Sequence, residues 1–212
     1  MLHRDPTRPL APWDTLFSPE SRITLPRSVD VVSADAIIKG VYLVEAGAVV
    51  EIKSDANNAS HAVSFCGMST VIGIPHSADA HATYGIRATT LMQTVLRVVT
   101  REEFVYATHH DALLTQAVLH EIARRTQEAG RLTDSCQHDT TAKHVLSILE
   151  SVASMFGSDA QGRSNAIIPP ALLERMCGCP WVMVRGALSE LTRRGLVAVD
   201  PEGVRLEKYL TA

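Results

Sequence analysis

Hydrophobic and polar positions follow two different patterns along the chain, and the pattern changes near residue 100. From Ile23 to Val99 apolar residues form short runs separated by polar or glycine-rich breaks, whereas later they recur every three or four positions. Short runs at a spacing of roughly 8–12 residues are typical of a sandwich or a double-sheet jelly roll, and the later spacing is typical of amphipathic helices. The sequence therefore predicts an α+β protein in which a double-stranded β-helix (jelly-roll) domain precedes the helices.

The predicted strands of the N-terminal part are short and regularly spaced. They are Ile37–Val44, Ala48–Ile52, His61–Phe65, Val71–Ile74, Tyr84–Ala88 and Leu91–Val99. A turn that ends in Gly47 lies between the first two runs, and Asp55–Asn58 makes the next polar break. Residues 1–20 carry prolines among polar residues, so we expect a loose arm that Trp13, Leu16 and Phe17 attach to the domain.

One long helix is predicted after the β domain. Thr100 and Glu103 have the spacing of a capping box, and no proline occurs between Phe104 and Cys136. The apolar stripe of this helix consists of Leu114, Val118, Ile122, Ala129 and Leu132. Such a stripe can pack on the helix's own sheet, or it can pair with the same helix of a second chain as a coiled-coil seam. We expect a homodimer that is joined along this stripe.

A helix-turn-helix motif is predicted over residues 168–195, after a helix over Thr141–Phe156. Pro169 and Pro170 can begin the first short helix, because the first turn of a helix has no intrahelical use for its N–H groups. Gly178 can end that helix in a left-handed conformation. In the second helix the inward face is formed by Val184, Leu188 and Leu191.

A two-stranded hairpin is predicted directly after this motif. Leu196–Val199 and Val204–Leu206 are short apolar runs, and Asp200–Gly203 between them has the composition of a turn. A hairpin in this position is the wing of a winged helix-turn-helix domain. The second helix of such a domain can enter the major groove of DNA with its first two turns against the base edges.

The outward face of the predicted second helix holds the candidate DNA-binding residues. They are Trp181, Val182, Arg185, Ser189, Thr192 and Arg193. Arg185 is the candidate for a bidentate pair with guanine, while Thr192 and Arg193 at the helix end suit a phosphate contact or a surface charge. The alternative interpretation is a small packed module that makes protein contacts only.

Length and charge limit the possible classes of protein. With 212 residues, of which 46% are hydrophobic, the chain can form two ordinary domains. The net charge is −3, but residues 1–140 hold 12 Lys and Arg against 16 Asp and Glu, and residues 141–212 hold 8 against 7. This small shift favours a DNA-facing C-terminal half. No apolar run is long enough for a membrane helix, and Met1–Pro12 has no signal-peptide core, so we expect a cytoplasmic protein.

Cysteine and histidine side chains could carry other chemistry. The candidates are Cys66, Cys136, Cys177, Cys179, His61, His76 and His81. The cysteines are too scattered for a disulfide framework, and the histidines have no H-x-H pattern with a carboxylate, which a jelly-roll metal enzyme would need. No phosphate-binding loop, metalloprotease motif or serine-hydrolase motif occurs. We expect reduced cysteines, no metal, no cofactor and no enzymatic activity.

The order of the predicted elements resembles that of the Crp/Fnr family of bacterial transcription regulators. Val41–Val49 resembles the family's second hairpin, in which apolar residues precede a Gly turn, and Ile168–Gly195 with its wing resembles the family's DNA-binding motif. The likeness extends over nearly the whole chain. It implies a β-roll sensor domain over residues 1–100, a dimerisation helix over residues 101–136, and a winged helix-turn-helix DNA-binding domain over residues 137–212.

Two short segments depart from the family's nucleotide-binding pattern. Where cyclic-nucleotide-binding members carry a Gly-Glu pair and then an Arg-Ser or Arg-Thr pair, this chain has Gly73-Ile74 and Ala82-Thr83. Ribose and phosphate groups need polar or charged partners to offset their desolvation, so binding of cyclic AMP is not expected. Residues 1–40 contain no Cys, so the iron–sulfur centre of oxygen-sensing relatives is not expected either.

The second helix of the motif also departs from the family. Trp181, Val182 and Gly186 stand where well-studied members have Arg, Glu and Arg, and Pro180 replaces the Ser cap. We therefore expect a sequence-specific, homodimeric regulator whose target differs from the family's usual half-site. Its expected partners are double-stranded DNA, a second copy of the chain and, by resemblance, RNA polymerase; the sequence names no effector. The alternative is a jelly-roll protein that binds a small ligand or a metal and uses its winged helix for protein contacts.

Overall fold

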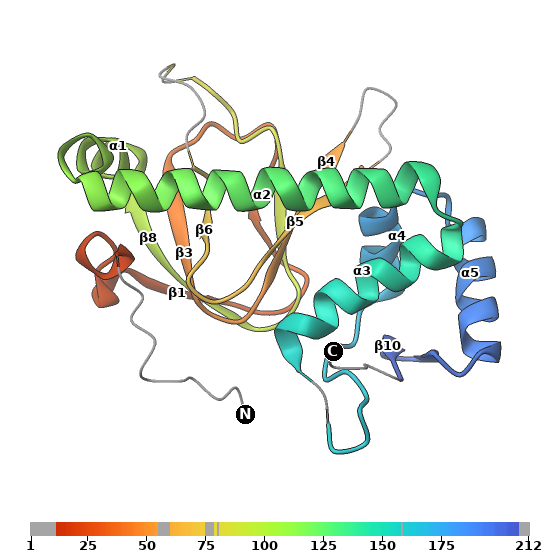
Figure 1. The fold of residues 1–212 in the computed structure, drawn as a ribbon. Helices are drawn as coiled ribbons and strands as arrows, with labels where there is room; N and C mark the ends of the chain where they lie inside the picture. Colours follow the sequence, from red (N-terminus) through yellow and green to blue (C-terminus); the bar gives the residue numbers. More distant parts are fainter. Residues whose placement is uncertain (1–11, 55–59, 75–78, 80, 158, 208–212) are drawn as a thin grey trace. The chain divides into compact units, whose positions relative to one another are not determined.

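The computed structural model describes residues 12–54, 60–74, 79, 81–157 and 159–207, which form a mixed α+β structure (Figure 1). The chain divides into two compact units. One consists of the part up to Lys53 together with Cys66–Gln127, and the other of Ser54–Phe65 together with the part from Glu128 onward. The boundary falls within the long helix α2 (Ala112–His138), so this helix contributes residues to both units.

Two four-stranded sheets form the β-roll. The strand order of the first sheet is β1 (Arg22–Leu25), β8 (Thr94–Thr100), β3 (Gly40–Ala46) and β6 (Val71–Ile72). The order of the second sheet is β2 (Asp30–Val32), β7 (Arg87–Thr90), β4 (Val49–Ser54) and β5 (Ser60–Cys66). The predicted fold class is therefore confirmed, with two short strands upstream of the first predicted run.

The chain passes from the first sheet to the second at Gly47. The φ of this residue is +97°, and a Cβ there would lie 2.7 Å from the Cα of Thr94, so only glycine fits. β3 pairs with β6 and β8, and β4 pairs with β7. The hairpin expected from Val41–Val49 is therefore wrong as a strand pairing, because β6 and β8 already occupy both edges of β3.

Two buried aromatic side chains attach the N-terminal arm. They lie next to two short helices, η1 (Trp13–Thr15) and η2 (Pro19–Ser21). Trp13 and Phe17 meet edge to face with ring centroids 6.3 Å apart. They belong to an apolar cluster with Val41, Leu43, Val71, Val99, Phe104 and Leu114. The predicted attachment of the arm is confirmed for its described residues.

Two helices stand where the sequence predicts a single one. α1 (Arg101–His110) begins at the predicted capping box, in which Thr100 and Glu103 bond each other's backbone N–H groups. α1 ends at Asp111, whose backbone is extended. The carboxylate of Asp111 then accepts the N–H of Leu113 at 2.8 Å and so begins α2. The prediction of one continuous helix is wrong because this aspartate caps a new helix.

The second unit contains the predicted winged helix-turn-helix. Its elements are α3 (Thr141–Phe156), α4 (Pro170–Cys177), α5 (Trp181–Arg193), β9 (Val197–Asp200) and β10 (Gly203–Leu206). α3 has the predicted bounds, and Thr140 caps it by accepting the N–H of Lys143. Among the helices of the described residues, none has both the length and the apolar character to cross a membrane.

Candidate nucleic-acid interface and the β-roll

The turn between α4 and α5 is fixed by one predicted residue and by one that sequence reasoning missed. Gly178 is left-handed with a φ of +66°, as predicted. Pro180 gives no side-chain cap to α5, but the carboxylate of Glu174 on α4 accepts the N–H of Trp181 at 3.1 Å. Glu174 thus supplies the acceptor that the absent Ser would have provided, and its negative charge favours the positive end of α5.

α5 has one buried and one exposed face. The buried residues are Val184, Ala187, Leu188 and Leu191, which include all three residues that the spacing predicts. Val182 is 64% exposed, Trp181 is half-buried, and Arg185, Ser189, Thr192 and Arg193 are exposed. Met183, which the sequence analysis did not select, is also exposed. The predicted DNA-binding residues therefore lie on the outward side of one helix.

Two cations on this outward face have no carboxylate within ion-pair distance among the described residues. They are Arg185 and Arg193; in contrast, Arg194 lies 3.5 Å from Glu190, one helical turn away. The hydroxyl of Ser189 donates to the carbonyl oxygen of Arg185 at 3.0 Å, so the helix backbone already uses it. The guanidinium groups of Arg185 and Arg193 can therefore donate hydrogen bonds to a base edge or a phosphate.

The predicted wing is present and is anchored to the segment before α4. Ile168 and Val204 exchange two backbone hydrogen bonds, at 2.9 and 2.8 Å. At the tip the carboxylate of Asp200 accepts the N–H groups of Glu202 and Gly203, which closes the turn. Because the tip carries two acidic residues, it does not offer the positive charge that a phosphate contact needs.

A buried histidine that sequence reasoning missed lies beside the end of α4. His144 is 3% exposed, and its Nε2 lies 3.1 Å from the carbonyl oxygen of Cys177, the last residue of α4. Its Nδ1 lies 3.2 Å from the hydroxyl of Ser135 on α2. Burial lowers the pKa of His144, so the imidazole is neutral at pH 7. The helical spacing of His144 with Ile148 and Val152 is the signal that could have placed it on the inward face.

The four cysteines are free thiols. Cys66 and Cys177 are fully buried, and burial raises the pKa of Cys66 to about 11 and that of Cys177 above its usual range. Burial also raises the pKa of Cys179. The thiols of Cys66, Cys177 and Cys179 are therefore protonated at neutral pH, and the buried Cys66 and Cys177 behave as small apolar side chains.

The β-roll contains a buried ion pair that sequence reasoning also missed. The guanidinium of Arg125 on α2 donates to both carboxylate oxygens of Glu51 on β4, at 2.8 and 3.1 Å. It also donates to Glu121 and to the carbonyl oxygen of Val71. Glu51 is 2% exposed, and burial raises its pKa while the charge of Arg125 opposes this rise. The chain's own side chains thus satisfy these polar groups in the first unit.

The positions that depart from the nucleotide-binding pattern lie in apolar surroundings. Ile74 packs against the apolar cluster that contains Trp13 and Leu43, and Ala82 packs against a second cluster that contains Val44 and Leu96. Neither side chain can bond a hydroxyl or a phosphate oxygen.

The candidate metal ligands do not come together in the described part of the chain. Cys66 lies in the β-roll beside Arg125, whereas His61 forms a backbone bridge with Cys177 of α4 in the second unit. The side chain of His81 is 86% exposed, and His76 lies outside the described residues. No group of three potential ligands forms within the described ranges.

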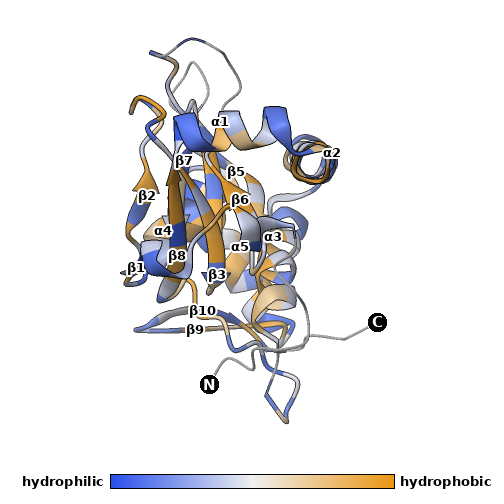
Figure 2. Ribbon diagram, turned by 90° about the vertical axis from the view of Figure 1, so that its left-hand side faces the viewer, coloured by the Kyte–Doolittle hydropathy of each residue, from blue (hydrophilic) through white to orange (hydrophobic). Residues whose placement is uncertain are grey.

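The predicted apolar stripe of α2 is partly buried and partly exposed. Leu114 and Leu132 are 3% and 2% exposed, and Leu114 belongs to the apolar cluster that contains Trp13 and Leu43. Val118 and Ala129 are half-buried, and Ile122 is 46% exposed. Leu119, outside the predicted stripe, is 61% exposed. Figure 2 views α2 nearly along its axis and shows both hydrophobic and hydrophilic residues around it.

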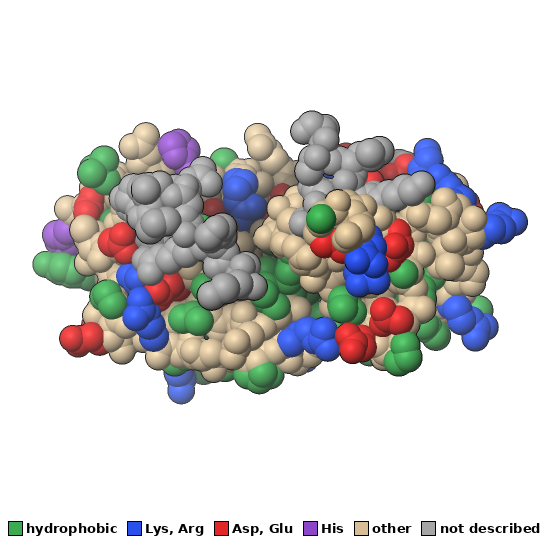
Figure 3. Space-filling view, turned by 90° about the horizontal axis from the view of Figure 1, so that it is seen from below, with side chains coloured by type: hydrophobic (Ala, Val, Ile, Leu, Met, Phe, Trp, Pro, Cys, Tyr) green, Lys and Arg blue, Asp and Glu red, His purple; other side chains and the backbone are tan. Residues whose placement is uncertain are grey.

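The surface charge does not by itself mark a DNA-binding face. Figure 3 shows acidic and basic side chains interspersed among the described residues of the face that it presents. This distribution agrees with the small net charge of −3. An interface with DNA would therefore depend on particular arginines and not on a broad basic surface.

Solved structures with this fold include transcription regulators. TTHB099 from Thermus thermophilus, a transcriptional regulator of the CRP family, has a TM-score of 0.72 at 15% identity over 88% of this chain and 92% of its own. FixK2 from Bradyrhizobium japonicum has a TM-score of 0.70 at 17% identity over 88% and 91%. CLP from Xanthomonas campestris, a c-di-GMP-responsive global regulator, has a TM-score of 0.69 at 19% identity over 87% and 92%.

No protein-family model matches the sequence, and no curated protein matches it either. At these low identities the structural likeness establishes the fold. The chain has the fold of the Crp/Fnr regulators, a β-roll with a C-terminal winged helix-turn-helix, as the resemblance of its sequence predicts.

Proposed function

We propose that this protein is a DNA-binding transcription regulator that reads DNA with α5. The observation that carries the proposal is the exposed guanidinium of Arg185, which has no acidic partner among the described residues and lies on the outward face of the second helix of the motif. A guanidinium can donate to both O6 and N7 of guanine, while Arg193 at the helix end suits a phosphate. The Crp/Fnr fold supports this assignment, because TTHB099 and CLP are regulators.

Selection of duplexes from a random-sequence pool at low salt tests this function. We expect a palindromic site to be enriched and its affinity to fall steeply with salt, with a log–log slope of about −0.9 for each phosphate contact. If the full-length protein holds no duplex at low salt, the regulator function fails, and the alternative that the winged helix makes protein contacts gains support.

We also propose a homodimer through α2, with its seam at Ile122 and Leu119 and with Val118 and Ala129 at its border. Ile122 and Leu119 are 46% and 61% exposed in the single chain, and a second copy of α2 would cover them. Ile122→Glu would place a charge in the seam of both subunits, and sedimentation should then show monomers. Gln127→Glu adds the same charge on another side of α2 and should leave the dimer intact. A dimeric Ile122→Glu variant would overturn this seam.

The sensor domain, in this proposal, does not take cyclic AMP. Its support is the apolar packing of Ile74 and Ala82 and the internal pairing of Arg125 with Glu51. A calorimetric titration of the full-length protein with cyclic AMP should show no heat of binding. Micromolar binding would overturn this part of the proposal while leaving the DNA-binding part in place.

A further inference from the structure

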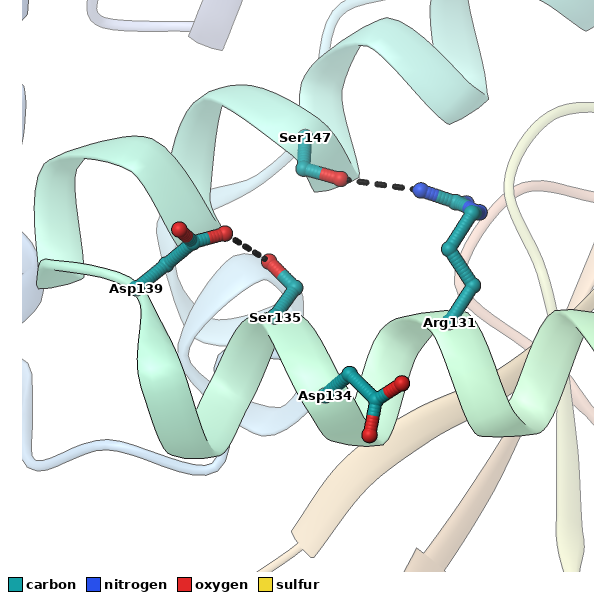
Figure 4. Close-up of a pocket in the computed structure, with 5 residues that line it drawn as sticks. All are labelled: Arg131, Asp134, Ser135, Asp139 and Ser147. Atoms are coloured by element: carbon teal, nitrogen blue, oxygen red, sulfur yellow. Dashed lines mark hydrogen bonds between the residues drawn. The ribbon is translucent and has the colours of Figure 1, made fainter.

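The end of α2 and the first half of α3 border a polar hollow of about 580 Å³ (Figure 4). Its lining residues are Arg131, Asp134, Ser135, Asp139 and Ser147, all within the second unit. The volume falls in the range of small-molecule sites, about 300–1,000 Å³. Since every lining side chain is polar, the hollow suits a ligand whose own groups are charged.

One wall of the hollow offers donors without a matching negative charge. The guanidinium of Arg131 donates to the hydroxyl of Ser147 at 3.0 Å and to that of Ser151 at 2.8 Å. Across the described part of the chain, no carboxylate lies within ion-pair distance of this guanidinium. Neutral hydroxyls leave its charge uncompensated. A planar fork of N–H donors in this state suits a carboxylate.

Two further lining residues offer acceptors. Asp134 lines the hollow from α2, and Asp139 follows the end of that helix (Figure 4). One carboxylate oxygen of Asp139 accepts the hydroxyl of Ser135 at 3.1 Å. Two carboxylates favour cationic groups and repel a phosphate or a dicarboxylate. Together, the guanidinium of Arg131 and these two carboxylates fit a molecule that carries one anionic and two cationic groups.

The hydroxyl of Ser135 lies between two acceptors, the carboxylate of Asp139 and Nδ1 of His144. The carbonyl oxygen of Cys177 can only accept, so Nε2 of the neutral His144 carries the imidazole proton and Nδ1 is an acceptor. The hydroxyl of Ser135, which is 8% exposed, lies 3.2 Å from Nδ1 of His144 and 3.1 Å from Asp139. Its single proton therefore faces two acceptors. An ammonium group bound to the exposed carboxylate of Asp139 would compete with the Ser135 hydroxyl for that carboxylate.

We propose that this hollow binds a basic α-amino acid. The carboxylate of the ligand pairs with Arg131, and its two cationic groups pair with Asp134 and Asp139. Once an ammonium satisfies Asp139, the proton of Ser135 is free to bond His144, which in turn donates to the last carbonyl of α4. Ligand binding thereby changes the hydrogen bonds of His144, which contacts the end of α4 just before the turn that positions α5. This regulatory step rests on the proposed DNA-binding function, whereas the binding step does not.

Calorimetry on the full-length protein tests the binding step. L-lysine and L-arginine should bind. L-alanine, which lacks the second cationic group, and putrescine, which lacks the carboxylate, should bind at least about tenfold more weakly. Succinate should not bind, because it lacks both cationic groups. Asp139→Asn, Asp134→Asn and Arg131→Gln should each lower the affinity for L-lysine by about tenfold. Glu150→Gln, an exposed change elsewhere on α3, should not. Absence of L-lysine binding, or an affinity for L-lysine in the three variants that equals that of the wild type, overturns the site.

Comparison of duplex affinity with and without saturating L-lysine tests the regulatory step. We expect a change of at least about threefold in the wild-type protein and none in Ser135→Ala, which removes the hydroxyl between Asp139 and His144. An unchanged affinity in the wild type overturns the regulatory step. If L-lysine binds but no duplex is ever held, the proposed DNA-binding function fails and the amino-acid site stands.

Discussion

Arg125 and Arg185 are chemically identical side chains with opposite surroundings. Within the first unit, the guanidinium of Arg125 donates hydrogen bonds to Glu51, Glu121 and a backbone carbonyl. On α5, Arg185 is exposed and no carboxylate of the described residues pairs with it. The first arrangement holds the fold, because removing either partner leaves a buried charge; the second leaves donors available to another molecule. Pairing within the chain, and not residue type, separates the buried, paired Arg125 from the exposed Arg185 that we propose to bind DNA.

The largest expected effect is the loss of the buried pair. Arg125→Ala leaves the carboxylate of Glu51 buried without its cation, and we expect the free energy of unfolding to fall by about 3–5 kcal/mol. Chemical denaturation at pH 7 measures this change. The matched control is Arg124→Ala on the same helix, whose side chain is 41% exposed and should cost less than about 1 kcal/mol.

A double variant sharpens this result. Replacing Arg125 and Glu51 together with Met and Leu removes both charges, so most of the stability should return. If Arg125→Ala is as stable as the wild type, the pair does not hold the β-roll, and the contrast with Arg185 loses its basis.

A second paired carboxylate in the same unit predicts a dependence on pH. Hydrogen bonds from Arg22 and then Arg97 lower the pKa of Glu45 to about 2, against the burial that would raise it. Since the pKa is depressed in the folded state, this contribution is present above pH 4.5 and is lost as the pH falls toward 2. Glu45→Gln should remove on the order of 3 kcal/mol at pH 7 and flatten the stability profile in that window. A variant whose profile still parallels that of the wild type contradicts this origin.

The helix-turn-helix was predictable because its signals are local. Gly178 and the spacing of Val184, Leu188 and Leu191 depend only on neighbours in the chain, and the structure confirms each of them. Glu174 was not predictable as a cap, because its partner at Trp181 is reached only through the turn. The break at Asp111 was missed because no proline marks it, although an aspartate before a helical run is itself a start signal.

The contents of the β-roll were not predictable from hydrophobic spacing. Arg125 lies on the same side of α2 as Leu114 and Leu132, but a search for apolar residues passes over a charged one. Its partner Glu51 is distant in sequence, and only the pairing of strands brings the two together. A charged residue can be predicted to be buried only when the partner that compensates its charge is known.

The next largest expected effect is a loss of DNA affinity when Arg185 is replaced. Arg185→Ala should weaken the selected duplex by about 1–3 kcal/mol and relax the preference at one base pair in each half-site, because the bidentate contact to guanine is lost. Binding to a panel of single-base variants of the site measures both. The melting temperature should stay close to that of the wild type, since Arg185 is exposed. Unchanged affinity and preference would mean that α5 does not read bases through this residue.

The smallest expected effect separates the two exposed arginines of α5 from each other. Arg193 lies in the last turn, beyond the residues that face base edges, so a phosphate is its partner in the proposed complex. Arg193→Ala should weaken all duplexes alike, leave the base preference unchanged and make the salt slope shallower by about 0.9, the release of one counterion contact. Titrations at several salt concentrations on the selected site and on a scrambled duplex measure this. Arg194→Ala is the matched control, because Arg194 already lies near Glu190. A loss of base preference in Arg193→Ala would move this residue from the phosphate backbone to the base edges.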